Sequence, residues 1–229
     1  MLSLGPLDIA SMLWLFACWG GYALYARHTR AGTLMAAMHT HRLNWMENML
    51  GRENRMVDAN IMGTVMRSVG LFASTTIFIV GGLIAVLGSV DKARDVVNIL
   101  PFTVEASTVV WEVKIVLMLL IYIYAFFKFA WALRQFNYSI IFVGAAPAHD
   151  STDEAAKKDF AVRAARVVSL AVNSFNQGLR AYYFGLAALG WFIHPVVFAG
   201  AALFVVGVLY RREFRSRMLK ALAGDGPVT

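Results

Sequence analysis

A row of polar side chains in the last third of the chain has the residue types and the spacing of a binding surface. Its members are Arg166, Ser169, Asn173, Asn176, Gln177 and Arg180. Successive members are three, four, three, one and three residues apart, so all six share one face of a helix. We call them the polar row. Their amides and guanidinium groups offer hydrogen-bond donors, which suit an anion.

Other patterns of catalytic or metal-binding chemistry are missing from the sequence. It contains no glycine-rich phosphate loop, no nucleophile elbow, and no CxxC or HExxH pattern. His39 and His41 are two positions apart and therefore point to different sides of a helix, and no two acidic residues are placed for acid–base catalysis. We expect no metal and no cofactor, and the sequence favours a non-enzymatic role.

The composition identifies the environment of the polar row as a membrane. Hydrophobic residues make up 59% of the 229 residues and charged residues only 15%, against ~25% in a typical soluble domain. The mean hydropathy is +0.60. The net charge of +7 indicates anionic lipid headgroups rather than nucleic acid as the partner, because basic residues orient a membrane protein and no soluble face interleaves aromatic and basic residues.

Apolar periodicity predicts an all-α membrane protein that forms a single domain over residues 1–229, with four to five crossings. The predicted spans are residues 9–26, 68–90, 113–134, 174–193 and 196–210. Helical segments 31–67 and 135–173 are expected in the cytoplasm. His194-Pro195 predicts a turn between the last two spans, which either cross fully or form a deep re-entrant loop.

The helix that starts near Val113 meets no glycine or proline before Gly144. At ~1.5 Å per residue it exceeds a hydrocarbon core of ~30 Å and must project on the inner side. Lys114 and Lys128 on this helix are interpreted as snorkelling to opposite interfaces.

Basic residues set the expected orientation. Arg27 and Arg30 follow the first span, whereas the connection Asp91–Glu112 is the least basic one. The positive-inside rule then puts the amino terminus outside and the carboxyl terminus in the cytoplasm, in the inner membrane if the protein is bacterial. The residues expected at anionic headgroups are Arg211, Arg212, Arg215 and Arg217, and those expected at an outer mouth, where they would favour cations, are Glu105 and Glu112.

Two further segments carry local signals. Seven of the eleven methionines lie between Met35 and Met66, and we expect this stripe to pack on a neighbouring helix or at the lipid interface. The polar segment 147–159 is the one true linker, with Asp150, Ser151 or Thr152 as the cap of the next helix.

Several stretches together resemble an uncharacterised family, domain of unknown function 599. They are FASTTIFIVGG (72–82), AFFKFAWALRQFNYSIIFVGAAP (125–147), FNQGLRAYYFGLAALGWFIHP (175–195) and VLYRREFRS (208–216). The resemblance runs from about residue 40 to residue 220. It implies a multi-span membrane protein and carries over no catalytic or binding residue.

The sequence leaves two functions open. In the first, the protein is a channel or transporter for a small ion or solute, assembled as a homo-oligomer with the polar rows around its axis. In the second, it is a scaffold or lipid-interacting protein, with Arg180 paired to Glu47, Glu53 or Asp58. Glycines at 178 and 185, and again at 200 and 207, mark two close-packing lines, either facing each other in the hairpin or joining subunits.

Overall fold

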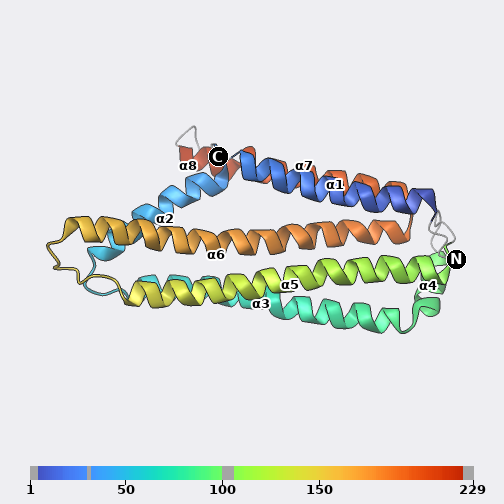
Figure 1. Ribbon diagram of the computed structural model, residues 1–229, viewed down its shortest axis with the longest axis horizontal. Coiled ribbons are helices and arrows are strands. Elements are labelled where there is room, and N and C mark those ends of the chain that lie inside the picture. Colours follow the sequence, from blue (N-terminus) through green and yellow to red (C-terminus); the bar gives the residue numbers. More distant parts are fainter. Residues whose placement is uncertain (1–4, 30–31, 100–105, 224–229) are drawn as a thin grey trace.

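The computed structural model describes residues 5–29, 32–99 and 106–223, and this part of the chain is built from helices without strands. The elements are α1 (Pro6–His28), α2 (Leu34–Leu50), α3 (Met56–Leu87), α4 (Val90–Asn98), α5 (Thr108–Gly144), α6 (Glu154–Ala188), the 3-10 turn η1 (Leu189–Phe192), α7 (Pro195–Phe214) and α8 (Arg217–Ala223). Figure 1 shows that they form an elongated bundle with α5 and α6 side by side along its length.

The fold is that of an all-α membrane protein, as the sequence predicted. Four helices are long and apolar enough to cross a membrane, namely α1, α3, α5 and the helix that begins at Pro195. The polar row leaves α6 outside this group, yet the second half of α6 is held between α5 and α7. A fifth crossing by α6 therefore depends on its helical neighbours rather than on its own hydropathy.

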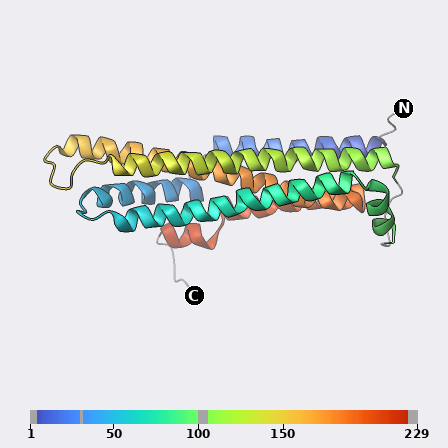
Figure 2. The same cartoon turned by 90° about the horizontal axis from the view of Figure 1, so that it is seen from below.

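The molecule has two parts, which Figures 1 and 2 show from two directions. In the first, the membrane bundle, α1 and α7 lie alongside parts of α3, α5 and α6. In the second, the extension, α2 and the first half of α3 pack against the remaining halves of α5 and α6. With 37 residues, α5 is about 55 Å long and exceeds a ~30 Å hydrocarbon core, so its length accounts for the extension.

The seam between α5 and α6 is the tightest contact of the membrane bundle. A Cβ at Gly178 would lie 2.5 Å from the Phe129 ring, and one at Gly185 would lie 2.8 Å from the Tyr122 ring. Both glycines therefore face α5 and let aromatic rings rest on the α6 backbone. The alternative in which they face Gly200 and Gly207 within the hairpin is wrong, because a Cβ at either of those positions would meet open space.

The turn at His194-Pro195 is confirmed. After η1, the His194 imidazole Nδ1 accepts a hydrogen bond from the Val196 amide and caps α7, while Pro195 occupies its first turn. The Trp14 indole then donates to the Ala199 carbonyl at 3.1 Å and ties α1 to α7.

Three local expectations need correction. Segment 31–67 is not one helix, because Gly51–Arg55 forms a turn that separates α2 from α3. The connection after Asp91 contains α4, which crosses the end of the bundle and whose Val90 packs with Trp111 and Ile115. The cap of α6 is Asp153, whose carboxylate accepts from the Ala156 amide at 2.9 Å, so the three preceding candidates are not the cap.

The methionine stripe packs on neighbouring helices, as expected. Met46, Met49 and Met62 are at most 2% exposed and fill the core of the extension against α5 and α6. At its tip, the buried Asp58 carboxylate accepts hydrogen bonds from Arg52 and from the Trp45 indole. The extension is therefore a packed continuation of the bundle.

Candidate functional site

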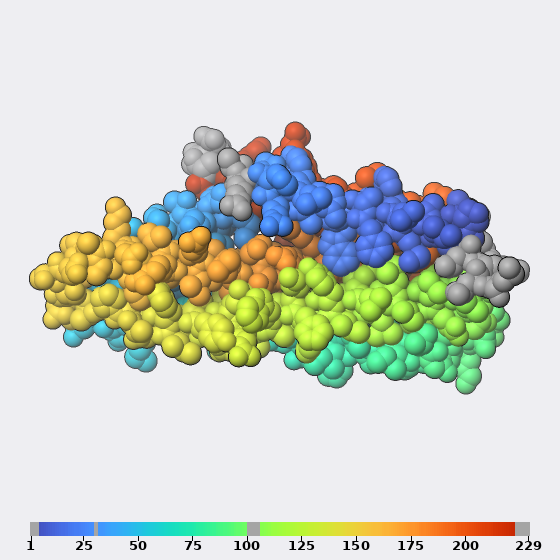
Figure 3. Space-filling view, in the orientation of Figure 1, coloured from blue at the N-terminus to red at the C-terminus, as the bar shows by residue number. Residues whose placement is uncertain are grey.

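Two adjoining cavities lie where α1, α2, α6 and α7 meet, at the junction of the membrane bundle and the extension. One, the polar lobe, has a volume of about 750 Å³, and the other, the apolar lobe, has about 530 Å³. Four residues line both lobes: Met35, Arg42, Arg180 and Glu213. Figure 3 shows α1 and α2 lying over α6 along this side of the molecule. We treat the two lobes as one candidate site.

The polar row lies mostly inside this site. Ser169, Asn173, Gln177 and Arg180 line the polar lobe, and Asn176 and Arg180 line the apolar lobe. Arg166 is exposed and lines neither lobe. The shared helix face inferred from the spacing thus brings five of the six side chains to one place, opposite α1 and α2 of the same chain.

Helix α2 supplies polar groups that the sequence analysis did not assign to the site. The Ser169 hydroxyl accepts a hydrogen bond from Arg42 Nη1 at 2.9 Å and lies 2.9 Å from His39 Nδ1. Burial lowers the pKa of the Arg42 guanidinium, which still remains charged because arginine does not deprotonate in proteins. The sequence signal for this contact was the presence of Arg42 and His39 in an apolar helix, but nothing in their spacing indicated the partner helix.

Positive charge dominates the polar lobe. Arg27, Arg42 and Arg180 line it together with His39, and Glu213 is the acidic residue among its described lining side chains. A cavity walled mostly by one sign of charge concentrates ions of the opposite sign. The electrostatics of the lobe therefore favour an anion.

Arg180 keeps donors available. Its guanidinium lies over the Tyr22 ring, 5.1 Å from the ring centroid, which is a cation–π contact. No carboxylate of the described residues lies within ion-pair distance of it. The expected pairing with Glu47, Glu53 or Asp58 is wrong for Asp58, which binds Arg52 instead, and Glu47 is exposed.

Met35 stands between the lobes. Its amide donates to Glu213 Oε1 at 3.2 Å, and its sulfur accepts a hydrogen bond from Asn176 Nδ2 at 3.2 Å. It therefore links α2 to both α6 and α7. An unbranched methionine adapts its shape readily, so this wall can move without a change of backbone.

The opposite end of the bundle contains a separate cavity of about 340 Å³, whose lining residues include Asp8, Lys114 and Trp191. The Lys114 ammonium donates to the Trp191 carbonyl at 3.0 Å and lies 3.6 Å from the Asp8 carboxylate, to which the Trp191 indole also donates. Lys114 is only 5% exposed, so its interpretation as a snorkelling residue is wrong. The second lysine of α5, Lys128, lies over the Tyr124 ring.

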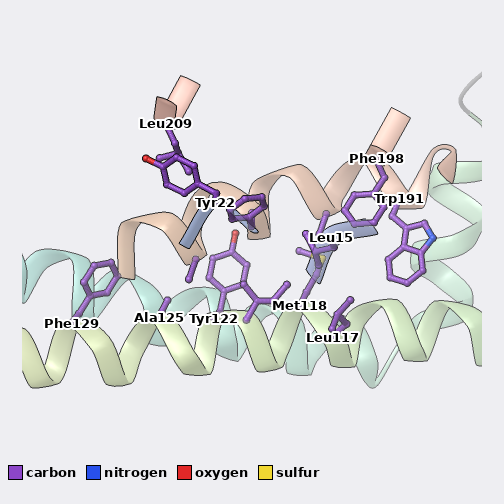
Figure 4. Close-up of a cluster of buried hydrophobic side chains, with 14 residues drawn as sticks. Leu15, Tyr22, Leu117, Met118, Tyr122, Ala125, Phe129, Trp191, Phe198 and Leu209 are labelled. Carbon is purple, nitrogen blue, oxygen red and sulfur yellow. The ribbon is translucent and has the colours of Figure 1, made fainter. Parts of the chain in front are cut away.

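An apolar layer separates this end from the polar lobe. Figure 4 shows it, with Leu15, Met118 and Tyr122 between Phe129 and Trp191. From Tyr124, which lines the polar lobe, to Lys114 the chain of α5 rises by about 15 Å. The polar row therefore does not continue as an open path through the membrane bundle.

The predicted outer-mouth and headgroup residues have different surroundings. Glu112 is exposed near the Lys114 end of the bundle, and Glu105 lies outside the described residues. Arg212 turns toward the site, where it lines the apolar lobe and donates to the Tyr183 hydroxyl. All four arginines of this group are exposed, and the other three line neither lobe: Arg211, Arg215 and Arg217.

The described residues hold no cluster of three or more His, Cys, Asp or Glu side chains that would suit a metal ion. A family profile described as a protein of unknown function, DUF599, matches residues 10–218. No curated protein and no solved structure matches the chain.

Proposed function

This chain belongs to the DUF599 family of unknown function, and from the geometry of its cavity we propose that it is an anion transporter. The substrate enters the polar lobe at the basic end of the membrane bundle and binds Arg180 and its neighbours. Passage to the other side requires the apolar layer to open.

One observation carries this proposal: a basic cavity adjoins the membrane bundle at one end, and a layer of packed apolar side chains separates this cavity from the other end. Ligand sites in membrane transporters lie within the bundle and are exposed to one side at a time. The layer of about 15 Å beyond Tyr124 is filled by buried residues of α1, α5, α6 and α7. This supports alternating access rather than an open channel.

Sidedness and assembly are part of the proposal. Basic residues at the cavity end put this end in the cytoplasm, with the amino terminus outside and the carboxyl terminus inside. Tags at residue 1 and in the Asp91–Glu105 segment should report outside, and tags near Asp150 and Thr229 inside. We further propose a homo-oligomer formed through the open face of α7 at Gly200 and Gly207.

Purified protein in liposomes tests the transport proposal. We expect efflux of chloride, sulfate or inorganic phosphate that exceeds efflux of potassium. Arg180→Gln should reduce the anion flux by at least tenfold, whereas Arg166→Gln, on the same helix but outside both lobes, should leave it unchanged. Equal loss in both variants, or selective flux of cations, would contradict an anion site at Arg180.

A lipid-interacting protein without transport is the second candidate. It is favoured by the exposed arginines at the end of α7, because basic side chains at a membrane surface attract anionic headgroups. Vesicle flotation separates the two candidates. Lipid binding without any flux would favour the second one.

A further inference from the structure

We infer that the ligand of this cavity is an amphiphilic anion, with its acidic head in the polar lobe and one hydrocarbon chain in the apolar lobe. The inference rests on the proposed function, because it names the substrate class of the same cavity. It commits to a single-chain amphiphile rather than to a free inorganic anion.

The hydrophobic lining of the apolar lobe does not suit a small inorganic anion. It is walled by hydrophobic side chains from six helices, among them Met38, Trp45, Met62, Phe136, Val172 and Leu179. Its volume of about 530 Å³ falls in the range of small-molecule sites, about 300–1,000 Å³. A hydrated ion gains nothing from such walls, whereas a hydrocarbon chain gains burial.

The two lobes meet where the head and the chain of an amphiphile would join. Arg42 and Arg180 border both lobes, so an acidic head bound to them lies at the entrance of the apolar lobe. Met35 borders both lobes as well, and its flexible side chain can move to let the chain pass. Arg212 adds a third cation on the apolar side.

The apolar lobe also reaches the surface of the molecule. Ile61 and Val65 of α3 line it, and these residues are 44% and 39% exposed. A chain can therefore enter between α2 and α3, beside the junction of the extension with the membrane bundle, without crossing the basic lobe. This lateral access suits a ligand that partitions into the bilayer.

Chain length provides the decisive measurement. The protein in nanodiscs of zwitterionic lipid is titrated with inorganic phosphate and with butyl, hexyl and octyl phosphate, and tryptophan fluorescence is read against empty nanodiscs. Burial of each methylene should tighten binding about fourfold, or roughly two-hundredfold from butyl to octyl phosphate. Affinity that does not change with chain length would overturn the inference.

Two variants separate the lobes. Val172→Trp fills the apolar lobe and should abolish the chain-length dependence while inorganic phosphate binds as before. Arg180→Gln should weaken all the phosphates by about tenfold, and Arg166→Gln should match the wild type. If Val172→Trp fails to fold, the wild-type protein still tests the inference through the alkyl phosphate series and through titration with octanol. Octanol that binds as tightly as octyl phosphate would show that the acidic head contributes nothing to binding.

The outcomes for transport and for ligand class are distinct. Chain-length-dependent binding without anion flux overturns transport and leaves the ligand class standing. Flux of inorganic phosphate with binding that ignores chain length overturns the ligand class and leaves transport standing.

Discussion

Lys114 and Arg180 are both cations inside the membrane bundle, and the fold surrounds them in opposite ways. Lys114 is 5% exposed and has a carboxylate, a carbonyl oxygen and the Trp191 ring around its ammonium group. Arg180 is partly buried, contacts the Tyr22 ring and borders about 750 Å³ of cavity. Lys114 also borders a cavity, of about 340 Å³, so the difference lies in the hydrogen-bond donors that remain for a ligand.

A buried cation with complete partners contributes to structure, because its attraction to those partners repays the cost of removing it from water. A cation with free donors beside a cavity has lost part of its hydration, and no partner compensates for this loss until a ligand binds. Arginine has five N–H donors, so one ring contact leaves most of them available. The comparison assigns a structural role to Lys114 and a binding role to Arg180.

The largest effect is expected at Lys114. Lys114→Met leaves the Asp8 carboxylate without its counter-charge, and removal of one partner of a buried pair costs about 3–5 kcal/mol. Unfolding in mild detergent should therefore occur at a much lower temperature. The double variant Asp8→Asn with Lys114→Met should recover much of the loss. Wild-type melting of the single variant would show that the pair contributes little and would weaken the comparison.

The next effect concerns the seam between α5 and α6, close to Arg180. Gly178→Ala places a Cβ 2.5 Å from the Phe129 ring, and overpacking of this kind costs about 1–3 kcal/mol. Gly200→Ala is the matched control, since its Cβ meets open space and alanine favours a helix by up to about 1 kcal/mol. Thermal melting of both variants checks the difference. Equal stability would mean that the seam is looser than the contact distances indicate.

At Arg180 the expected effect on stability is smaller still. Arg180→Gln should change the free energy of unfolding by about 1 kcal/mol or less, because no carboxylate partner among the described residues is left behind. Its anion binding should nevertheless fall by about tenfold. Melting and phosphate titration of the same sample measure both. A strong destabilisation would show that Arg180 belongs with Lys114 among the structural cations.

Much of the fold could be predicted because hydrophobic periodicity reports which faces of a helix are buried. The long α5 and the turn at His194-Pro195 followed from local signals. The turn at Gly51–Arg55 did not, although a glycine and four polar residues mark it, because apolar spacing resumes on both sides. Helix α4 was missed since nine residues give too short a pattern within a charged connection.

The candidate site was predicted in part for the same reason. Spacing placed the polar row on one face, but periodicity does not say which helix covers that face. The cover is α2, whose Arg42 lies more than a hundred residues away in the chain. The pairing of Lys114 with Asp8 was likewise out of reach, because it joins residues from two helices that only tertiary packing brings together.

The smallest effect on stability is expected on the outer face of α7. Gly200→Leu and Gly207→Leu add side chains in open space, so unfolding should change by about 0.5 kcal/mol or less. In a bilayer, small residues permit close helix approach, and bulky replacements should break an oligomer joined there. Native mass spectrometry in mild detergent reports the subunit count.

The polar row faces α1 and α2 of its own chain, so phosphate binding at Arg180 should survive dissociation. A wild type that is strictly monomeric in several mild detergents would refute the proposed oligomer, and a binding site lost together with it would show that Arg180 needs a second subunit.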